Sequence, residues 1–236
     1  MKIVMIHGQS HTGCSCMVAR KTAEKIGGEV QEFFLPNDFN HHCLGCYTCF
    51  TSALEKCPHY KDLSGIIEAI DHADVLILSS PVYVYHVTGA MKDLLDHFGT
   101  WWVVHRPHPQ MCCKQAVIVT TAAGGGMKST AKDIEDSLAM WGVHRIEKLC
   151  FGVQATKLDE IPAFIMKRIE SKTTQVAKKV RRNHGTVGAN MRFVMWFYIV
   201  KLMHRLMPSD TPDYRWWENH GWHGRKRPWD WKRVNG

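Results

Sequence analysis

Short apolar runs and amphipathic segments alternate along residues 1–182, and this alternation limits the possible folds more than any other feature. Runs rich in branched residues are typical of buried strands, and apolar residues three and four positions apart are typical of helices. Strands joined by helices pair in parallel, which gives an α/β doubly wound sheet covered on both faces. We expect strands at residues 2–6, 30–35, 75–78, 115–121 and 145–153, and helices at residues 17–26, 61–72, 87–98, 127–141 and 159–182.

A C-terminal extension follows this alternating part of the chain. Residues 183–190 contain two glycines among mostly polar neighbours, which is typical of a linker. We therefore expect one sheet domain at residues 1–182 and a helical, Trp-rich extension at residues 183–236. The charge differs between the two parts: residues 1–166 carry 14 Lys and Arg against 17 Asp and Glu, whereas residues 167–236 carry 16 against 5. Such a basic end suits an anionic partner or a solvated helix face.

The apolar stripe at residues 191–207 is too hydrophobic to be solvated on all sides. It must pack on the sheet domain, on a second subunit or on a membrane surface. Residues 214–222 interleave tryptophans with cations, a composition that suits a cover over a flavin or substrate pocket and could also stack nucleobases. No nucleic-acid-binding fold surrounds this segment, so we expect no nucleic-acid partner.

Neither end of the sequence reads as a membrane or export element. Residues 1–8 form one short apolar run that ends in glycine, which is typical of a strand and not of a secretory signal. The apolar run at residues 193–200 covers 8 residues, whereas a helix needs about 20 to cross a bilayer. We expect a cytoplasmic protein, and its nine cysteines are then expected as thiols or ligands and not as disulfides.

The loop after the first expected strand has the composition of an anion-binding turn. Small and hydroxylated residues at positions 8–15 lead into a helix, whose N-terminal N–H groups and dipole attract anions. The stretch from Ser10 to Ser15 resembles the phosphate loop of flavodoxins, S/T-x-T-G-x-S/T. This resemblance implies that the FMN 5′-phosphate is held by Ser10, Thr12, Gly13, Cys14 and Ser15.

The stretch after the third strand, Ser79 to Lys92, is the most specific motif of the chain. It resembles the S-P-V/I-Y segment of the NAD(P)H-dependent FMN reductase and iron–sulfur flavoprotein family, in which this loop lies along the isoalloxazine ring. Aromatic side chains give a flat apolar surface for such a ring. The resemblance implies flavin contacts from Pro81, Val82, Tyr83, Val84 and Tyr85.

Three glycines at residues 124–126 end the fourth strand and let the backbone approach a flat ligand or a phosphate closely. Relatives carry a Gly-rich loop beside the flavin here, which implies contacts from Thr121, Ala122, Gly124 and Gly125. All three loops follow strands, and open α/β sheets bind ligands at the carboxyl ends of their strands. The resemblance covers residues 1–155 and implies a flavodoxin-like five-stranded sheet of order 2-1-3-4-5.

Four cysteines are spaced as metal ligands: Cys43, Cys46, Cys49 and Cys57 follow the pattern C-x2-C-x2-C-x7-C. Thiolates at such spacing hold iron–sulfur clusters, and four of them also suit a tetrahedral zinc site. The segment resembles the compact motif of iron–sulfur flavoproteins, which implies a [4Fe–4S] cluster. Relatives also keep similar cysteines as free thiols, so the cluster, zinc and free thiols all stay open. The neighbouring His41 and His42 are further possible ligands.

The resemblance implies an FMN-dependent oxidoreductase that takes electrons from NAD(P)H or another reduced donor and reduces a small-molecule acceptor. Flavin N5 would carry the hydride, so the protein needs no nucleophile, and Tyr83 or Tyr85 could donate a proton. The alternative is an electron-carrier iron–sulfur flavoprotein that serves protein partners. Relatives are usually dimers or tetramers, so we expect a homodimer or homotetramer and favour a subunit contact for the apolar stripe over membrane contact.

Overall fold

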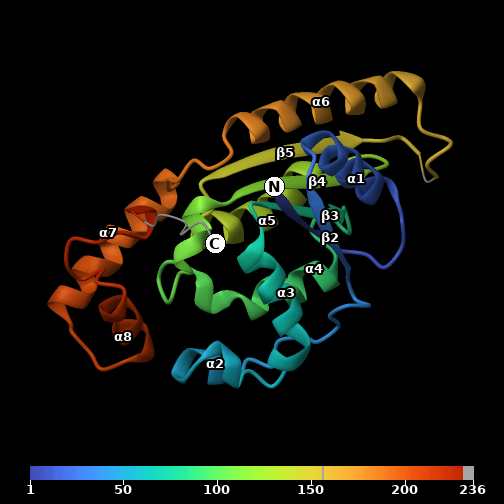
Figure 1. The fold of residues 1–236 in the computed structure, drawn as a ribbon. Helices are drawn as coiled ribbons and strands as arrows, with labels where there is room; N and C mark the ends of the chain where they lie inside the picture. The colour runs from blue at the N-terminus through green and yellow to red at the C-terminus, as the bar shows by residue number, and fades with distance from the viewer. Residues whose placement is uncertain (156, 231–236) are drawn as a thin grey trace.

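The computed structural model describes residues 1–155 and 157–230. Within them, five strands form one parallel sheet in the order β2-β1-β3-β4-β5 (Figure 1). This confirms the predicted flavodoxin-like, doubly wound sheet. The strands are β1 (Lys2–His7), β2 (Glu29–Phe34), β3 (Val75–Pro81), β4 (Gln115–Ala122) and β5 (Arg145–Gly152).

Two helical layers cover the sheet (Figure 1). Alternate residues of a strand face opposite sides, so Ile3 and Met5 of β1 pack under α1 (Cys14–Ile26) and α6 (Ala163–Arg182). Val4 and Ile6 contribute to the other core, under the three remaining large helices of the domain. These are α3 (Tyr60–His72), α4 (Gly89–His97) and α5 (Met127–Trp141).

Short helical elements lie between and after these large ones. They are α2 (Thr48–Thr51) and the 3₁₀ turns Leu54–Lys56, Gly99–Trp101, Pro109–Cys113 and Pro228–Asp230. Two long helices begin elsewhere than the sequence predicts. α1 begins at Cys14 and not at residue 17, because Gly13 takes the N-cap position. α6 begins at Ala163 and not at residue 159, because Pro162 is its N-cap and the residue before a proline, here Ile161, is disfavoured in the helical conformation. The earlier start of α1 brings its N-terminus directly to the predicted phosphate loop.

The C-terminal extension forms α7 (Met191–Leu206) and α8 (Pro212–Asn219). One face of α7 buries Phe193, Phe197 and Val200 in a third apolar core. Residues of the body, Val103, Cys112 and Met140, share this core with Trp217 and Trp222. One face of the apolar stripe therefore packs on its own chain. This is the alternative that we did not favour from the sequence. The division at residue 182 stays a prediction.

The opposite face of α7 is exposed and apolar. Met195 is 53% exposed, Leu202 55% and Leu206 72%. This exposed apolar face is compatible with the predicted subunit contact, which stays a prediction. No helix within residues 1–155 and 157–230 combines the length and the apolar character that a membrane span requires.

A buried lysine at the start of β4 makes stability depend on pH. Lys114 is 2% exposed and its Nζ donates to the carbonyl oxygens of Asp71 and Ala73, each at 2.9 Å. Burial lowers its pKa from 10.5 to about 8, although the charges of Asp71 and Cys113 oppose this. The free-energy cost of burying the charged lysine is full below about pH 8. It decreases as the pH rises towards the pKa that Lys114 has in the unfolded chain.

We therefore expect the wild-type protein to gain stability relative to Lys114→Met as the pH rises. Between pH 7 and pH 10 the difference in free energy of unfolding should shift by about 2 kcal/mol in favour of the wild type. Urea denaturation of both proteins at each pH measures this shift. Parallel pH profiles of the two proteins would contradict the assignment.

Candidate functional site

The loop after β1 ends at a helix N-terminus that no side chain caps. Gly13 occupies the N-cap position of α1 without a side-chain hydrogen bond, and the first turn contains no acidic residue. The N–H groups of a first turn have no partner within the helix. Ser15 lies in this turn, fully buried, and its Oγ has no hydrogen-bond partner. Free N–H groups, a helix dipole and an unpartnered buried hydroxyl together form a cradle for an anion.

This loop is fixed to the neighbouring strand and helix. The N–H of Gly8 donates to the carbonyl of Ser79 at 2.7 Å. A Cβ on Gly8 would lie 2.7 Å from Thr88 Oγ1, so only glycine fits there. Thr88 caps α4 by accepting from the N–H of Met91 at 3.2 Å. The end of β1 therefore lies beside the start of α4.

The loop after β3 presents apolar side chains to solvent. Tyr83 is 53% exposed, Val84 92% and Tyr85 66%. Val84 and Tyr85 have positive φ values of 48° and 67°, which is rare for a β-branched or bulky residue and marks backbone strain. Such a rigid apolar loop is suited to contact a flat ligand.

Three interactions hold the β3 loop in this conformation. Tyr83 and His86 exchange backbone hydrogen bonds of 2.9 and 3.0 Å. Ser129 Oγ donates to the carbonyl of Tyr85 at 2.5 Å. His86 Nδ1 lies 3.0 Å from a carboxylate oxygen of Asp133. Because Ser129 and Asp133 both belong to α5, the helix after β4 positions the loop after β3.

The glycine loop after β4 lies against the β3 loop. The N–H of Val82 donates to the carbonyl of Thr121 at 3.0 Å. A Cβ on Gly126, whose φ is 90°, would come within 2.7 Å of Val82 Cγ1, whereas one on Gly124 would meet open space. The two loops therefore touch at Gly126 and leave room at Gly124.

The structure thus gathers the predicted flavin-contact residues on three loops at the carboxyl edge of the sheet. In the first loop Ser10 and Thr12 are exposed, Gly13 and Cys14 are half-buried and Ser15 is buried. In the other loops Pro81, Val82 and Ala122 are half-buried, Thr121 is buried, and Tyr83, Val84, Tyr85, Gly124 and Gly125 are exposed. The sequence interpretation missed Thr88 and Ser129, although Thr88 lies inside the quoted motif.

The cysteine segment forms a surface loop around α2. Cys43 and Cys46 are exposed, and Cys49 and Cys57 are half-buried. Burial raises the pKa of Cys49, and negative charge on Cys57, Cys43 and Cys46 raises it further, so the four groups lie within electrostatic reach of one another.

The four sulfur atoms do not lie close enough together to share a single metal ion. Among the described residues, no three of them lie within 4.8 Å of one another. A single tetrahedral zinc ion would hold its sulfurs about 3.8 Å apart, given a Zn–S bond of about 2.3 Å. A four-iron cluster spaces its thiolates more widely, because each thiolate binds a different iron. The described sulfur positions are therefore too far apart for a single four-cysteine zinc ion, and they leave a cluster and free thiols open.

Arg106 ties the cysteine segment to the C-terminal extension. It is 8% exposed, and its guanidinium donates to the carbonyls of Cys49, Phe50 and Ser52. Its Nε also forms an ion pair with Asp213 of α8 at 2.9 Å. A cavity of about 590 Å³ opens beside it, between residues 51–55 and α8.

Three histidines lie close together: His41 precedes the cysteine segment in the sequence, His59 follows it, and His97 belongs to α4. His59 Nδ1 lies 2.9 Å from His97 Nε2, and the rings of His41 and His59 stack at 4.4 Å. Burial, together with His41 and His97, lowers the pKa of His59. Exposed His42 lies 2.8 Å from Asp93, which raises its pKa.

Comparison with known proteins agrees with this geometry. Residues 1–157 match the family model described as NADPH-dependent FMN reductase. The chain belongs to this FMN reductase family. The match ends shortly after β5, so the family assignment covers the sheet and its three loops.

Curated relatives of this FMN reductase family member include iron–sulfur flavoproteins. One from Archaeoglobus fulgidus is 32% identical over 89 residues, 38% of this chain and 39% of the relative. Another, from Methanocaldococcus jannaschii, is 31% identical over 100 residues, 41% of this chain and 51% of the relative. The matched stretch spans about two-fifths to half of the length of these relatives.

Solved structures show the same fold. A flavone reductase superposes with a TM-score of 0.57 at 17% identity, covering 78% of this chain and 62% of the other. An FMN-dependent NADH-azoreductase from Bacillus anthracis, solved with FMN, gives 0.57 at 12% identity, covering 77% of this chain and all of the other. At such identities the likeness concerns the fold alone.

Proposed function

We propose that this protein is an FMN-dependent oxidoreductase that takes electrons from NAD(P)H and reduces a small-molecule acceptor in the cytoplasm. The observation that carries the proposal is the unpartnered, fully buried hydroxyl of Ser15 at the uncapped N-terminus of α1. A phosphate group would satisfy this hydroxyl and the free N–H groups together. Family membership over residues 1–157 supports the same cofactor.

The residues present fit FMN as follows. The first turn of α1, with Ser10, Thr12, Gly13, Cys14 and Ser15, would bind the phosphate. The exposed loop from Pro81 to Tyr85 would lie along the ring, and the glycine loop with Thr121, Ala122, Gly124 and Gly125 would border it. FMN, when bound, supplies the hydride and single-electron chemistry. Tyr83 and Tyr85 offer exposed phenol groups as candidate proton donors to the acceptor.

Anaerobic reconstitution with FMN, followed by steady-state NADH and NADPH oxidation, tests this proposal. Quinone, azo, nitro and free-flavin acceptors should be compared. We expect one FMN per chain and turnover with at least one acceptor. A colourless protein that takes up no FMN would overturn the cofactor assignment. FMN uptake without turnover by any acceptor would favour the electron-carrier alternative.

We further propose that Cys43, Cys46, Cys49 and Cys57 are the ligands of a [4Fe–4S] cluster. The electrostatic proximity of the four thiols and the names of the relatives support this. Iron and inorganic sulfide analysis of anaerobically purified protein is the test. Protein that cannot be reconstituted with four irons per chain would contradict the cluster.

The exposed face of α7 supports a homo-oligomer, because it is apolar and lies opposite the face that buries Phe193 and Phe197 in the body of the protein. We expect the double variant Leu202→Glu, Leu206→Glu to shift the protein from dimer to monomer in light scattering without lowering Tm. Ser171→Glu, at an exposed position of α6, is the matched control and should leave the mass unchanged. A monomeric wild-type protein would contradict this contact.

A further inference from the structure

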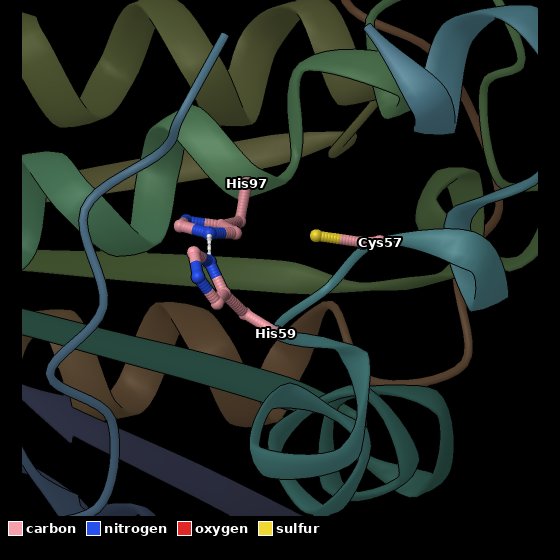
Figure 2. A group of neighbouring side chains, drawn as sticks. All are labelled: Cys57, His59 and His97. Carbon is pink, nitrogen blue, oxygen red and sulfur yellow. Dashed lines mark hydrogen bonds between the residues drawn. The ribbon is translucent and has the colours of Figure 1, made fainter. Parts of the chain in front are cut away.

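One group of side chains outside the flavin edge has the composition of a metal site. Cys57 Sγ and one ring nitrogen each of His59 and His97 all lie within 4.8 Å of one another. Figure 2 shows the two imidazoles joined nitrogen to nitrogen, with their ring planes tilted by 52°, and the Cys57 sulfur directed towards the pair. One thiol and two imidazoles are ligands that zinc and similar divalent transition metals prefer.

The backbone fixes all three side chains. Cys57 is the C-cap of the 3₁₀ turn Leu54–Lys56, and His59 is the N-cap of α3. The N–H of Tyr60, the first residue of α3, donates to the carbonyl of Cys57 at 3.0 Å and fixes the turn that joins the two. His97 lies in the last turn of α4 and is 4% exposed. The ligands therefore come from two rigid helix ends, which suits a preorganised site.

The hydrogen bonds of His97 leave its Nε2 available to a metal. Its Nδ1 lies 2.7 Å from the carbonyl of Asp93. A carbonyl can only accept, so Nδ1 carries the proton and Nε2 keeps its lone pair. A backbone carbonyl in this position is the usual outer partner of a metal-bound histidine, because it fixes tautomer and ring orientation.

The distance between the two histidines also suits a metal ion. His59 Nδ1 and His97 Nε2 are 2.9 Å apart and share one proton. Two nitrogens on a tetrahedral zinc ion lie about 3.3 Å apart, since Zn–N is about 2.0–2.1 Å. A movement of a few tenths of an ångström would admit the ion. The shared proton would then move to the outer nitrogen of His59.

The second such group in the described part of the chain, His7, Cys16 and Glu32, lacks this freedom. Arg20 binds both oxygens of Glu32 at 2.7 and 2.9 Å. His7 uses Nδ1 on Ser79 Oγ at 2.7 Å and Nε2 on Glu32 at 3.2 Å. Its polar atoms are already satisfied, so a metal would have to break existing bonds.

We propose that Cys57, His59 and His97 form a mononuclear site for a divalent transition metal of the zinc type, with a fourth position left open. Three protein ligands and one open position are typical of zinc that binds water or a substrate. This site would use the same Cys57 thiolate as the proposed [4Fe–4S] cluster, so zinc would bind only to the cluster-free form of the protein.

The test is metal binding by the full-length, FMN-loaded protein after chelator treatment and desalting. We expect one Zn²⁺ per chain by elemental analysis after dialysis, and tetrahedral d–d bands with Co²⁺ on the red side of the flavin absorption. His59→Gln and His97→Gln should each weaken Zn²⁺ binding by at least about 10-fold, and Cys57→Ser should do the same.

Matched controls separate this site from the four-cysteine set. His72→Gln, at the other end of α3, and Cys43→Ser should leave Zn²⁺ affinity unchanged. Loss of Zn²⁺ in Cys43→Ser, its retention in His59→Gln, or no stoichiometric binding by the wild type would each overturn the proposal. Flavin absorbance in the same samples reports FMN binding separately, so a failure of the flavin proposal would be distinguished from a failure of the metal site.

Discussion

A Ser15→Asp variant is expected to bind FMN at least about 100-fold more weakly than the wild type. Ser15 is fully buried at the free N-terminus of α1. A carboxylate there would place a negative charge where the flavin phosphate is proposed to lie, and two like charges about 4 Å apart in a partly buried site repel by a few kcal/mol. Quenching of FMN fluorescence during titration measures the affinity.

Two comparisons make this test specific to the phosphate. The apo fold should tolerate the aspartate, because acidic residues are favourable in the first turn of a helix. Riboflavin lacks the phosphate, so its affinity should change little in the variant. Ser15→Ala, which removes the hydroxyl without adding charge, should lose only about 10-fold for FMN. Equal losses for FMN and riboflavin would show that the phosphate lies elsewhere.

Arg106→Leu is expected to lower the free energy of unfolding by about 3 kcal/mol. The substitution removes the ion pair with Asp213 and the donors to the carbonyls of Cys49, Phe50 and Ser52. For a chain of this length the corresponding loss in Tm is about 6–12 °C. The loosened cysteine segment should also be cut faster by trypsin.

Arg215→Leu is the matched control for this substitution. Arg215 pairs with Asp210 on the surface, and both side chains are mostly exposed. Exposed ion pairs contribute at most about 1 kcal/mol, so Tm should fall by at most a few degrees. A similar Tm for both variants and the wild type would show that Arg106 does not hold the segment.

The sheet was predictable because burial on both faces leaves a simple pattern. Residues 75–78 are continuously apolar since Leu76 faces one helical layer and Ile77 the other. The helix starts were less accessible, because they depend on single caps: Gly13 for α1 and Pro162 for α6. The packing of α7 was not predictable, because an apolar stripe does not indicate which surface covers it.

The candidate flavin edge was predictable in its residues but not in its conformation. The motif from Ser79 to Lys92 marks the loop, whereas the positive φ values of Val84 and Tyr85 arise from contacts with α5, some 45 positions later. The histidine pair could not be predicted at all. His59 and His97 are 38 positions apart, and only the packing of α3 beside α4 brings their rings together.

The contacts between α8 and residues near position 105 can form only after α8 has been synthesised. Trp217 Nε1 donates to the carbonyl of His105 at 2.7 Å, across 112 positions. A chain emerges from the ribosome N-terminus first, so all three loops of the candidate flavin edge are synthesised before α8. The cysteine segment therefore lacks the wall that α8 provides until residues 212–219 have been synthesised, and the ion pair between Arg106 and Asp213 forms only then.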